Sequence, residues 1–518
     1  MKGRFRQAIR ANTTLLEVVG VALISALALG SVIADVEGIL GPDGYYHFRL
    51  AAVLWEQGLM SSVEALPLTV FGEELPDHHL LWHWLLIPFT FFEDPFVGVQ
   101  VAAVVTGAMV PAGITLFARK MSIPLAPLWG LLAVCAVMTL PGRFVMLRAQ
   151  NIAILLILLS LYALIKERFR TLGVVAFCFM LTYHGAVILA PLVTLYAGAL
   201  WLHERRFSVK PFVFAGIGGL LGLTLNPYFP LSFEYLYFHT VLTVPEAGAA
   251  TGGGSEWSSP PWSMIWEHAW AVHCLLLASL GVAGWRHAKG RESKLTTAAT
   301  TLVFAALLAL TMYKGANRFG EYYGPLGIMA SALIFRDLMS QEDVPKGIVA
   351  ASWKRYAILA LLLSGLVTTH AIQGLGVVER FSLFRADKYS AIAERLRQEA
   401  EPGSMVYNSA YHDFPPLYFH APTMRYVIGL DTHYLSEANK ALYEEWRWIQ
   451  QVKANDPNDP APLIAAHFKS SFAVIAREHR GLAHRLHRSN HAKLLEATAY
   501  GWLFKVQLPR EPESSSSR

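Results

Sequence analysis

A small set of charged and imidazole side chains lies in short segments between long apolar stretches of the chain. The set comprises Asp43, Arg49, Asp77, His78, His79, Arg143, Arg148, Glu246 and Arg318. Carboxylates can bind a divalent cation or a hydroxyl or amide nucleophile, and arginines can hold a phosphate through paired, charge-assisted hydrogen bonds. Together these residue types fit a transfer reaction in which a phosphate is the leaving group.

Two of these positions have a structural alternative in turns and helix caps. Asp43 lies in the segment Gly41-Pro42-Asp43-Gly44, which is a common turn composition. Asp77 precedes an apolar stretch and could cap a helix there, because Asp is a favoured N-cap residue. Imidazole and carboxylate groups both bind divalent ions, so the segment Asp77-His78-His79 could equally supply metal ligands.

The remaining candidates also have a simpler interpretation. Arg143 and Arg148 could anchor the protein at the membrane interface instead of holding a phosphate. Glu246 stands in a glycine-rich loop and could simply be solvated. Tyr183 and His184 lie between two apolar stretches, so we expect them to pack within a helical bundle.

Membrane-spanning helices are the elements expected to position these residues. Of the 518 residues, 54% are hydrophobic and 16% are charged, which is too apolar for a soluble protein of this length. A helix crosses the hydrocarbon core of a bilayer with about 20 predominantly apolar residues. The sequence predicts eleven such spans, at 14–35, 94–118, 122–140, 149–165, 171–186, 187–202, 210–226, 264–285, 296–313, 321–337 and 353–372.

The distribution of Lys and Arg predicts the orientation, because cytoplasmic loops carry an excess of both. Twenty lie on one side, within 2–10, 119–120, 166–170, 205–210, 286–294 and 336–355. Five lie on the other side, namely Arg49, Arg143, Arg148, Lys314 and Arg318. We therefore expect a multi-pass protein of the plasma or inner membrane with a cytoplasmic N-terminus and a periplasmic or extracellular C-terminal domain. The same bias explains the net charge of +5 without any nucleic-acid partner.

The non-cytoplasmic side is expected to carry two long loops and a soluble domain. The predicted transmembrane domain covers 1–375, with outside loops at 36–93 and 227–263. Residues 380–512 show alternating strand and helix patterns, which indicates a small α/β domain. Its predicted strands are 404–407, 425–429 and 472–476, and its predicted helices are 387–400 and 436–452. The serine-rich tail 513–518 is expected to be disordered.

Four short motifs occur in sequence order on the predicted outside face. Asp43 is followed by aromatic residues and, six residues later, by an Arg; Gln150 to Ile154 begins a span directly after a short loop. Thr243 to Glu246 reads Thr-Val-Pro-Glu, and Arg318 stands seven residues before Pro325. All four resemble motifs of the catalytic subunit of oligosaccharyltransferase and its relatives in the GT-C class of membrane glycosyltransferases. The resemblance covers roughly residues 10 to 375.

This resemblance implies a GT-C-like fold and a role for single residues. Asp43 would be a metal ligand or the carboxylate that activates the nucleophile, and Glu246 would lie near the acceptor. Arg318 would hold the phosphate of a lipid-linked donor. The residues that would bind substrate are Tyr46, Arg49, Arg148, Arg318 and Tyr322. A divalent cofactor, Mg²⁺ or Mn²⁺, would then have Asp43 as a ligand, and the chemistry of Asp77, His78 and His79 makes them further candidate ligands.

Two departures separate this chain from that family. Where the family has acidic metal ligands in the second outside loop, this chain has Arg148, Ala149 and Gln150, which argues against a carboxylate-rich metal site. The Trp-Trp-Asp signature that reads a peptide acceptor is missing from the C-terminal domain, where the segment Tyr407 to Asp413 stands in its place. We therefore do not expect the acceptor to be chosen as it is in the sequon-reading enzymes.

These observations favour an inverting glycosyltransferase that moves a sugar or oligosaccharide from a polyprenyl phosphate or pyrophosphate. The acceptor would be a glycan, a protein or a lipid on the non-cytoplasmic side, and the partners would be the polyprenyl-linked donor and membrane lipid. The alternative from another class is a transporter or flippase for a lipid-linked glycan. A transporter should carry ionisable residues near mid-span, whereas here they gather at one face. A catalytically silent relative that acts as a binding subunit is also consistent with the missing acids.

Overall fold

The structure is a computed structural model that describes residues 2–34, 38–74, 77–237, 240, 256–289, 295–340, 357, 360–374, 386–451 and 458–508. The chain divides into two compact units. The helical unit comprises 1–36, 77–85 and 100–383, and the mixed unit comprises 37–76, 86–99 and 384–518. The predicted domain boundaries at 375, 380 and 512 lie outside the described residues.

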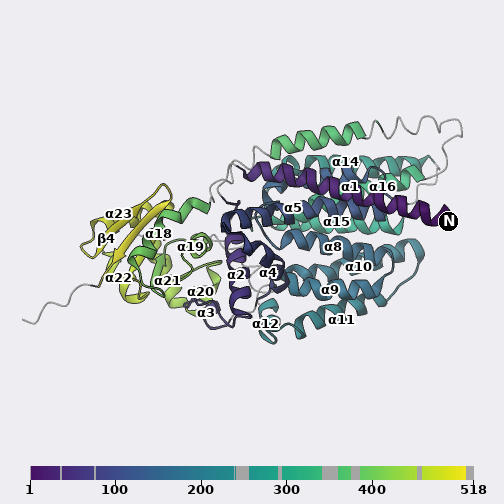
Figure 1. Ribbon diagram of the computed structural model, residues 1–518. Coiled ribbons are helices and arrows are strands. Elements are labelled where there is room, and N and C mark those ends of the chain that lie inside the picture. The colour runs from purple at the N-terminus through teal and green to yellow at the C-terminus, as the bar shows by residue number, and fades with distance from the viewer. Residues whose placement is uncertain are drawn as a thin grey trace, which may run out of the picture. The chain divides into compact units, whose positions relative to one another are not determined.

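Helical segments of very different lengths build the helical unit, and the longest of them lie side by side (Figure 1). They are α1 (Lys2–Ile33), α4 (Leu80–Leu86), α5 (Pro95–Lys120), α6 (Ala126–Cys135), α7 (Leu140–Phe144), α8 (Gln150–Ile165), α9 (Phe169–Thr182), η2 (His184–Ile188), α10 (Leu189–Glu204), α11 (Lys210–Thr224), α12 (Leu231–Tyr237), α14 (Trp262–Ala288), α15 (Thr297–Gly315), η4 (Asn317–Phe319), α16 (Gly320–Ser340) and the helical residues 360–374. Helix α9 packs against α8 and α11, and α16 packs against α14 and α15.

Each of the eleven predicted spans overlaps at least one of these helices. Among the described residues, five helices are long and apolar enough to cross a membrane: Asn12–Ile33, Pro95–Lys120, His184–Glu204, Trp262–Ala288 and Thr297–Gly315. Others are shorter, and α6, α8, α9 and α11 have 10, 16, 14 and 15 residues. The number of crossings therefore stays a prediction, while the apolar helices identify a membrane protein.

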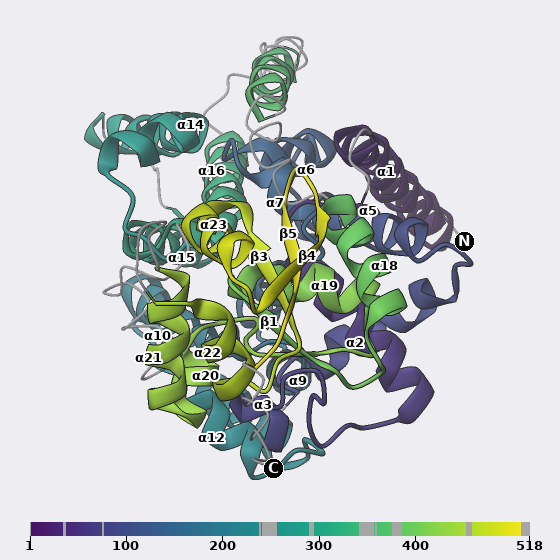
Figure 2. The same cartoon turned by 90° about the vertical axis from the view of Figure 1, so that its left-hand side faces the viewer.

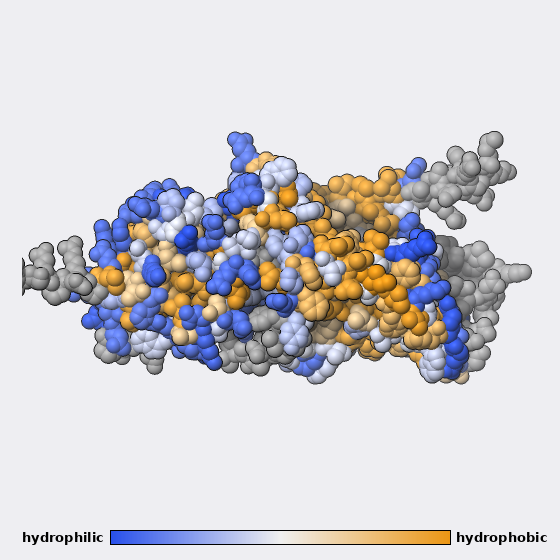
Figure 3. All heavy atoms as spheres, turned by 90° about the horizontal axis from the view of Figure 1, so that it is seen from below, coloured by the Kyte–Doolittle hydropathy of each residue, from blue (hydrophilic) through white to orange (hydrophobic). Residues whose placement is uncertain are grey.

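The outer surface of the helical unit is apolar. Large side chains such as Leu23 and Leu27 in α1, Ile217 and Leu220 in α11 and Leu277 in α14 are more than half exposed. Figure 3 shows apolar atoms gathered over the helical bundle on the face that is turned toward the viewer. Monomeric soluble proteins do not expose an apolar surface of this extent to water. We therefore assign this surface to contact with lipid.

Among the described residues, the mixed unit has one sheet of five strands, which is seen in Figure 2. They are β1 (Met405–Asn408), β2 (Arg425–Tyr426), β3 (Phe472–Ala476), β4 (Ala492–Ala497) and β5 (Gly501–Val506), in the order β2-β1-β3-β5-β4. Strand β1 is parallel to both β2 and β3, whereas β5 is antiparallel to both β3 and β4. The described helices of this unit are α2 (Asp43–Gln57), α3 (Val70–Glu73), η1 (Ile87–Phe91), η7 (Ala386–Tyr389), α18 (Ser390–Glu399), η8 (Tyr411–Asp413), α19 (Phe414–His420), α20 (His433–Ala438), α21 (Lys440–Gln450), α22 (Pro460–His467), η9 (Arg477–His479) and α23 (Arg480–Arg488).

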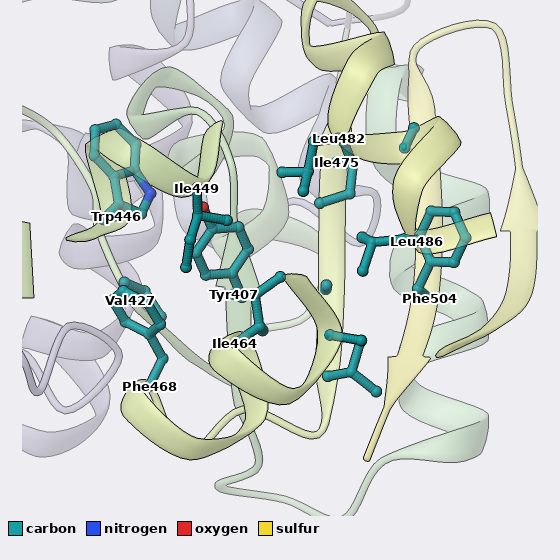
Figure 4. Close-up of a cluster of buried hydrophobic side chains, with 14 of the residues drawn as sticks. Tyr407, Val427, Trp446, Ile449, Ile464, Phe468, Ile475, Leu482, Leu486 and Phe504 are labelled. Carbon is teal, nitrogen blue, oxygen red and sulfur yellow. The ribbon is translucent and has the colours of Figure 1, made fainter. Parts of the chain in front are cut away.

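Apolar side chains from the sheet and its helices form the core of the mixed unit. Tyr407, Ile449, Ile475 and Leu486 are fully buried, and the side chains in this cluster point toward one another (Figure 4). The loop between α1 and α4 folds onto this domain, because the backbone N–H of Tyr426 donates to the carbonyl oxygen of Ala65 at 2.8 Å. The core therefore holds both the sheet and the loop that carries α2.

Candidate functional site

Three arginines and two glutamates form a cluster in the helical unit, at the ends where α8, α14 and α16 begin. This arginine–glutamate cluster consists of Arg143, Arg148, Glu256, Arg318 and Glu321. Nη1 of Arg143 donates to Oε1 of Glu321, and both side chains are buried. Nη1 of Arg148 donates to Oε2 and Oε1 of Glu256 at 2.9 and 3.1 Å. Because Nη1 of Arg143 also lies 3.7 Å from Oε1 of Glu256, that carboxylate joins the two arginines.

A sharp turn between α7 and α8 presents both Arg143 and Arg148. Leu147 adopts a φ of 51°, which lies in the left-handed region and reverses the chain direction after α7. Nδ2 of Asn151, in the first turn of α8, donates to the carbonyl oxygen of Phe144 at 2.9 Å. This hydrogen bond fixes the start of α8 against α7, so the two arginines are held by the fold of a buried turn.

The charges in the cluster do not cancel. Burial alone would raise the pKa of the Glu256 carboxyl, but the charges of Arg148, Arg143 and Arg318 outweigh burial and hold this pKa well below its ordinary range. Glu256 therefore stays ionised at any physiological pH. Three guanidinium groups and two carboxylates leave one net positive charge. An excess guanidinium charge in a partly desolvated site favours an anionic ligand such as a phosphate.

Arg318 belongs to the same cluster through its backbone and its side chain. Its backbone N–H donates to the carbonyl oxygen of Glu256 at 3.0 Å. The guanidinium carbon lies 4.4 Å from the centre of the Trp257 ring, a cation–π geometry that orients the side chain. Burial alone would lower the pKa of Arg318, but neighbouring Tyr183 and Glu256 raise the pKa above its ordinary value, so this arginine keeps its charge.

A break between α9 and η2 brings Tyr183 into the cluster. Tyr183 has extended backbone angles, φ −163° and ψ 130°, so α9 ends at Thr182. Gly185 has no room for a side chain, since a Cβ there would lie 2.2 Å from Cε1 of Tyr183. The Tyr183 hydroxyl consequently accepts from Nε2 of Gln150 at 3.4 Å and lies within hydrogen-bonding reach of Tyr322.

Asp77 forms hydrogen bonds within and across the turn that precedes α4. Its Oδ1 accepts from the backbone N–H of His79 at 2.9 Å, and its Oδ2 lies 2.8 Å from Nδ1 of His83. Burial alone would raise the pKa of Asp77, but His83 and the other hydrogen bonds lower the pKa below its ordinary value. This buried carboxylate fixes the turn before α4. In that turn the ring centroids of His78 and His79 are 4.0 Å apart.

Three other predicted residues, Asp43, Tyr46 and Arg49, lie on helix α2 of the mixed unit. Asp43 is the first residue of α2 and is partly exposed, while Tyr46 is buried with its ring 6.2 Å from that of Phe414. Six residues turn a helix through about 600°, so Asp43 and Arg49 point in directions about 120° apart. The helix therefore presents these two charged side chains to different surroundings.

Arg49 lines a polar cavity of about 620 Å³ in the mixed unit. Glu64 from the loop between α1 and α4 and Tyr418 and Arg425 from the C-terminal domain line the same cavity. Nε of Arg49 is buried and has no hydrogen-bond partner among the described residues. A guanidinium group beside a cavity of this size can hold an anionic or polyhydroxylated ligand.

Sequence reasoning missed two members of the cluster, and one predicted residue cannot be placed. Glu256 and Glu321 were not among the candidates, although Glu321 follows Arg318 by one helical turn and stands at the expected start of a span. A carboxylate at that depth is a functional signal by itself. Glu246 lies outside the described residues.

A divalent metal bound mainly by carboxylates does not fit the described part of the helical unit. The second-loop positions are Arg148, Ala149 and Gln150, and both glutamates of the cluster are paired with arginines. In the C-terminal domain, Asp413 is also occupied, because it accepts from Nζ of Lys388 at 2.9 Å and from the hydroxyl of Tyr389 at 2.6 Å. Among the described residues, one group that could hold a metal was found, and it consists of histidines.

No family model matches the chain, and no curated protein matches it. Several solved structures do match the chain. The apo oligosaccharyltransferase of Archaeoglobus fulgidus superposes with a TM-score of 0.64 at 12% identity, over 89% of this chain and 69% of that chain. ArnT from Cupriavidus metallidurans bound to undecaprenyl phosphate superposes with a TM-score of 0.55 at 12% identity, over 94% and 97% of the two chains. AglB from Archaeoglobus fulgidus in complex with an inhibitory peptide and a dolichol-phosphate gives 0.57 at 11% identity, over 94% and 74%.

The chain has a GT-C-like fold. The likeness to ArnT extends over nearly the whole of both chains, so it includes the helical unit and the C-terminal sheet. The predicted fold class, a polytopic helical membrane protein with a C-terminal α/β domain, is thereby confirmed. At 11 and 12% identity this likeness concerns the fold, and the chemistry has to be argued from the residues of this chain.

Proposed function

We propose that this protein is an inverting glycosyltransferase that uses a polyprenyl-linked sugar donor and an acceptor on the non-cytoplasmic side of the membrane. The observation that carries the proposal is the arginine–glutamate cluster, which keeps a net positive charge at the ends of membrane helices. The solved structures of similar fold support a lipid-phosphate ligand, because ArnT is bound to undecaprenyl phosphate and AglB to a dolichol-phosphate.

The chemistry of the transfer gives each group a task. An oxygen or nitrogen of the acceptor attacks the anomeric carbon of the sugar, and the bond from that carbon to the phosphate oxygen breaks. The electron pair leaves with the polyprenyl phosphate, whose growing negative charge Arg148 and Arg318 would stabilise. By the resemblance of its loop, Asp43 would accept the proton of the nucleophile. Arg49 would bind part of a substrate in the cavity of the mixed unit.

The position of the buried charges favours an enzyme over a transporter. In the described helical unit the buried Asp, Glu and Arg residues are Asp77, Arg143, Arg148, Glu321 and Asp337. Asp77 precedes α4, Arg143 lies in the short helix α7, Arg148 lies between α7 and α8, and Glu321 and Asp337 lie in the first and last turns of α16. A transporter path would require such groups near the middle of the spans.

The direct test is transfer by the purified full-length protein. The protein would be incubated with a panel of labelled polyprenyl phosphate and pyrophosphate sugars and a membrane extract that supplies acceptors. We expect one donor to be consumed, with release of the free polyprenyl phosphate and labelling of an acceptor. Movement of an intact labelled donor across vesicles that contain the protein, without consumption, would favour the flippase instead. Donor binding without either outcome would favour the silent relative.

Replacing Glu256 with Gln should strengthen donor binding. The Glu256 carboxylate accepts hydrogen bonds from Arg148 that a donor phosphate would otherwise accept. Because the pKa of Glu256 is low, this carboxylate stays ionised between about pH 5 and 8 and keeps its hold on Arg148. Removing the competing charge should therefore tighten the binding of a polyprenyl phosphate by about 1 kcal/mol, or about fivefold in Kd. Titration calorimetry in detergent measures the change.

A matched control for this variant is Glu204→Gln. Glu204 also pairs with an arginine, at 3.1 Å from Nη2 of Arg206, but that pair is exposed and outside the cluster. Its Kd for the polyprenyl phosphate should equal that of the parent. Weaker binding by Glu256→Gln would mean that Glu256 helps to build the donor site and does not compete with the donor.

The predicted orientation has its own test. A reporter fused after Lys388 should be active only in the non-cytoplasmic compartment, and a reporter fused after Lys120 only in the cytoplasm, because of the Lys and Arg asymmetry. A phosphatase that needs export and a fluorescent protein that needs the cytoplasm give opposite readouts for each fusion. Cytoplasmic activity of the fusion at Lys388 would remove the basis for placing the reaction outside.

A further inference from the structure

Three histidines from two distant segments converge in the helical unit. His78 and His79 precede α4, and His184 is the first residue of η2, more than 100 positions later in the chain. One ligand nitrogen from each ring lies within 4.8 Å of the others. The ring centroids are 5.2 Å apart for His78 and His184 and 5.7 Å apart for His79 and His184. His79 is buried and the other two are half-buried, so an ion could reach the group.

The local structure on each side fixes these rings. On one side Asp77 holds the turn through the backbone N–H of His79 and through Nδ1 of His83. On the other side the helix break at Tyr183 and the missing side chain of Gly185 place His184 directly after α9. The two segments meet only because the bundle folds, which is the arrangement that a preorganised ligand set requires.

We propose that His78, His79 and His184 bind one divalent metal ion of the kind that prefers nitrogen ligands, such as zinc. Neutral imidazole suits Zn²⁺, Co²⁺, Ni²⁺ and Cu²⁺, whereas Mg²⁺ requires mostly oxygen ligands in an octahedron. Three protein ligands with a fourth position left for water or substrate is the arrangement of catalytic zinc sites. This assignment keeps His78 and His79 from the predicted ligand set, adds His184 in place of Asp43 and Asp77, and replaces Mg²⁺ or Mn²⁺ with an ion that prefers nitrogen.

The distances and surroundings fit such an ion. Zinc–nitrogen bonds of 2.0 to 2.1 Å in a tetrahedron put ligand nitrogens about 3.3 Å apart. The most separated pair must therefore close by up to about 1.5 Å from the limit of 4.8 Å, which rotation of the imidazole rings can supply. The hydroxyl of Tyr235 lies 3.5 Å from Nε2 of His78, and its ring stacks on His78 at 4.3 Å. Outer groups of this kind orient ligand histidines in metal sites.

Electrostatics also favours a cation at this position. Asp77 is a buried acidic side chain whose Oδ1 accepts from the backbone N–H of His79 at 2.9 Å, so an acidic group lies beside the turn that carries His78 and His79. Both of its oxygens already accept from His79 and His83, and it therefore acts as a support for the ligands and not as a ligand. The proposal does not depend on glycosyl transfer, because metal binding can be measured without any donor or acceptor.

Cobalt supplies a spectroscopic test. The full-length protein, purified in detergent with an affinity tag that contains no histidine, would be freed of metal with a chelator and titrated with Co²⁺. We expect visible d–d absorption bands that saturate at one equivalent, disappear on addition of one equivalent of Zn²⁺ and persist in a large excess of Mg²⁺. Absence of these bands in the folded parent would overturn the proposal.

Single substitutions of the ligands decide which residues are responsible. His184→Ala and His78→Ala should each weaken Co²⁺ binding at least tenfold, whereas His203→Ala should bind like the parent, because His203 is an exposed residue of α10 that contacts Thr300. His184→Gln keeps a polar side chain of similar length, and gel filtration and thermal unfolding would verify its fold. A folded His184→Gln that binds Co²⁺ as tightly as the parent would exclude this site.

Discussion

Asp43→Asn is expected to abolish sugar transfer while leaving the amount and the fold of the protein unchanged. Asp43 is the first residue of α2 and is partly exposed, so the substitution removes a charge without opening a cavity in the core. Loss of a catalytic acid or base lowers a rate by roughly 100-fold to 10,000-fold. The measured quantity is the rate at which the purified protein releases free polyprenyl phosphate from a labelled donor, and Asp43→Ala should behave in the same way.

The control for Asp43 is a carboxylate of the same loop that has no proposed role. Glu93 lies at the end of the first outside loop and is exposed. Glu93→Gln carries the same change of charge, so its transfer rate should match that of the parent within a factor of about two, as for an ordinary surface substitution. If Asp43→Asn and Glu93→Gln were equally active, the proton-accepting role would have to move to another residue.

The helical part of the fold could be predicted because a bilayer imposes one pattern on the sequence. Each span needs an apolar stretch of sufficient length, and that stretch is visible without knowledge of its neighbours. The starting residues of α5 and α8, Pro95 and Gln150, agree with the predicted 94 and 149 within one position. The break inside the 122–140 span was not visible, because α6 ends at Cys135 and α7 begins at Leu140 within a run that is apolar throughout.

Only part of the C-terminal sheet could be predicted from the sequence, because only its buried strands have a clear apolar pattern. Strands β1 and β3 are buried and apolar, and the predicted 404–407 and 472–476 match Met405–Asn408 and Phe472–Ala476. The hairpin β4–β5 was missed. Strand β4 mixes half-buried and exposed residues, and its turn at Thr498 to Gly501 lacks the Asn-Gly or Asp-Gly pair that marks tight hairpins. The antiparallel part of the sheet became evident only in the structure.

The candidate site was predictable only in its cationic part. Arginines on the predicted outside face are few, so Arg148 and Arg318 stood out from the sequence alone. Their carboxylate neighbours did not, because the partner of Arg148 lies 108 positions away and the partner of Arg143 lies 178 positions away. His184 was expected to pack in the bundle for the same reason. Its position beside His78 depends on how η2 and the turn before α4 meet in the folded bundle, and no short motif encodes that contact.

Replacing Arg318 should weaken binding of the lipid donor. A guanidinium makes paired, charge-assisted hydrogen bonds to phosphate oxygens, and the single ammonium of Lys cannot reproduce that planar geometry. In this chain the Trp257 ring also orients the Arg318 guanidinium, whose carbon lies 4.4 Å from the ring centre. The guanidinium is therefore already oriented before the donor binds. A hydrogen bond to a charged group contributes about 1.5 to 3 kcal/mol, which corresponds to roughly a tenfold to hundredfold loss of affinity for Arg318→Ala. Arg318→Lys should lose less.

A direct titration of a polyprenyl phosphate into purified variants measures this loss, and Arg206→Ala serves as the control. Arg206 also pairs with glutamates, but both partners are exposed and separate from the cluster, so its removal should leave the donor Kd unchanged. The effect of Arg318→Ala should appear in the Kd of the donor and not in the KM of the acceptor, because the proposed role of this guanidinium is to bind the donor phosphate. If Arg318→Ala bound the donor as tightly as the parent, Arg318 would be an interfacial anchor held by Trp257, and Arg148 would be left as the main phosphate contact of the cluster.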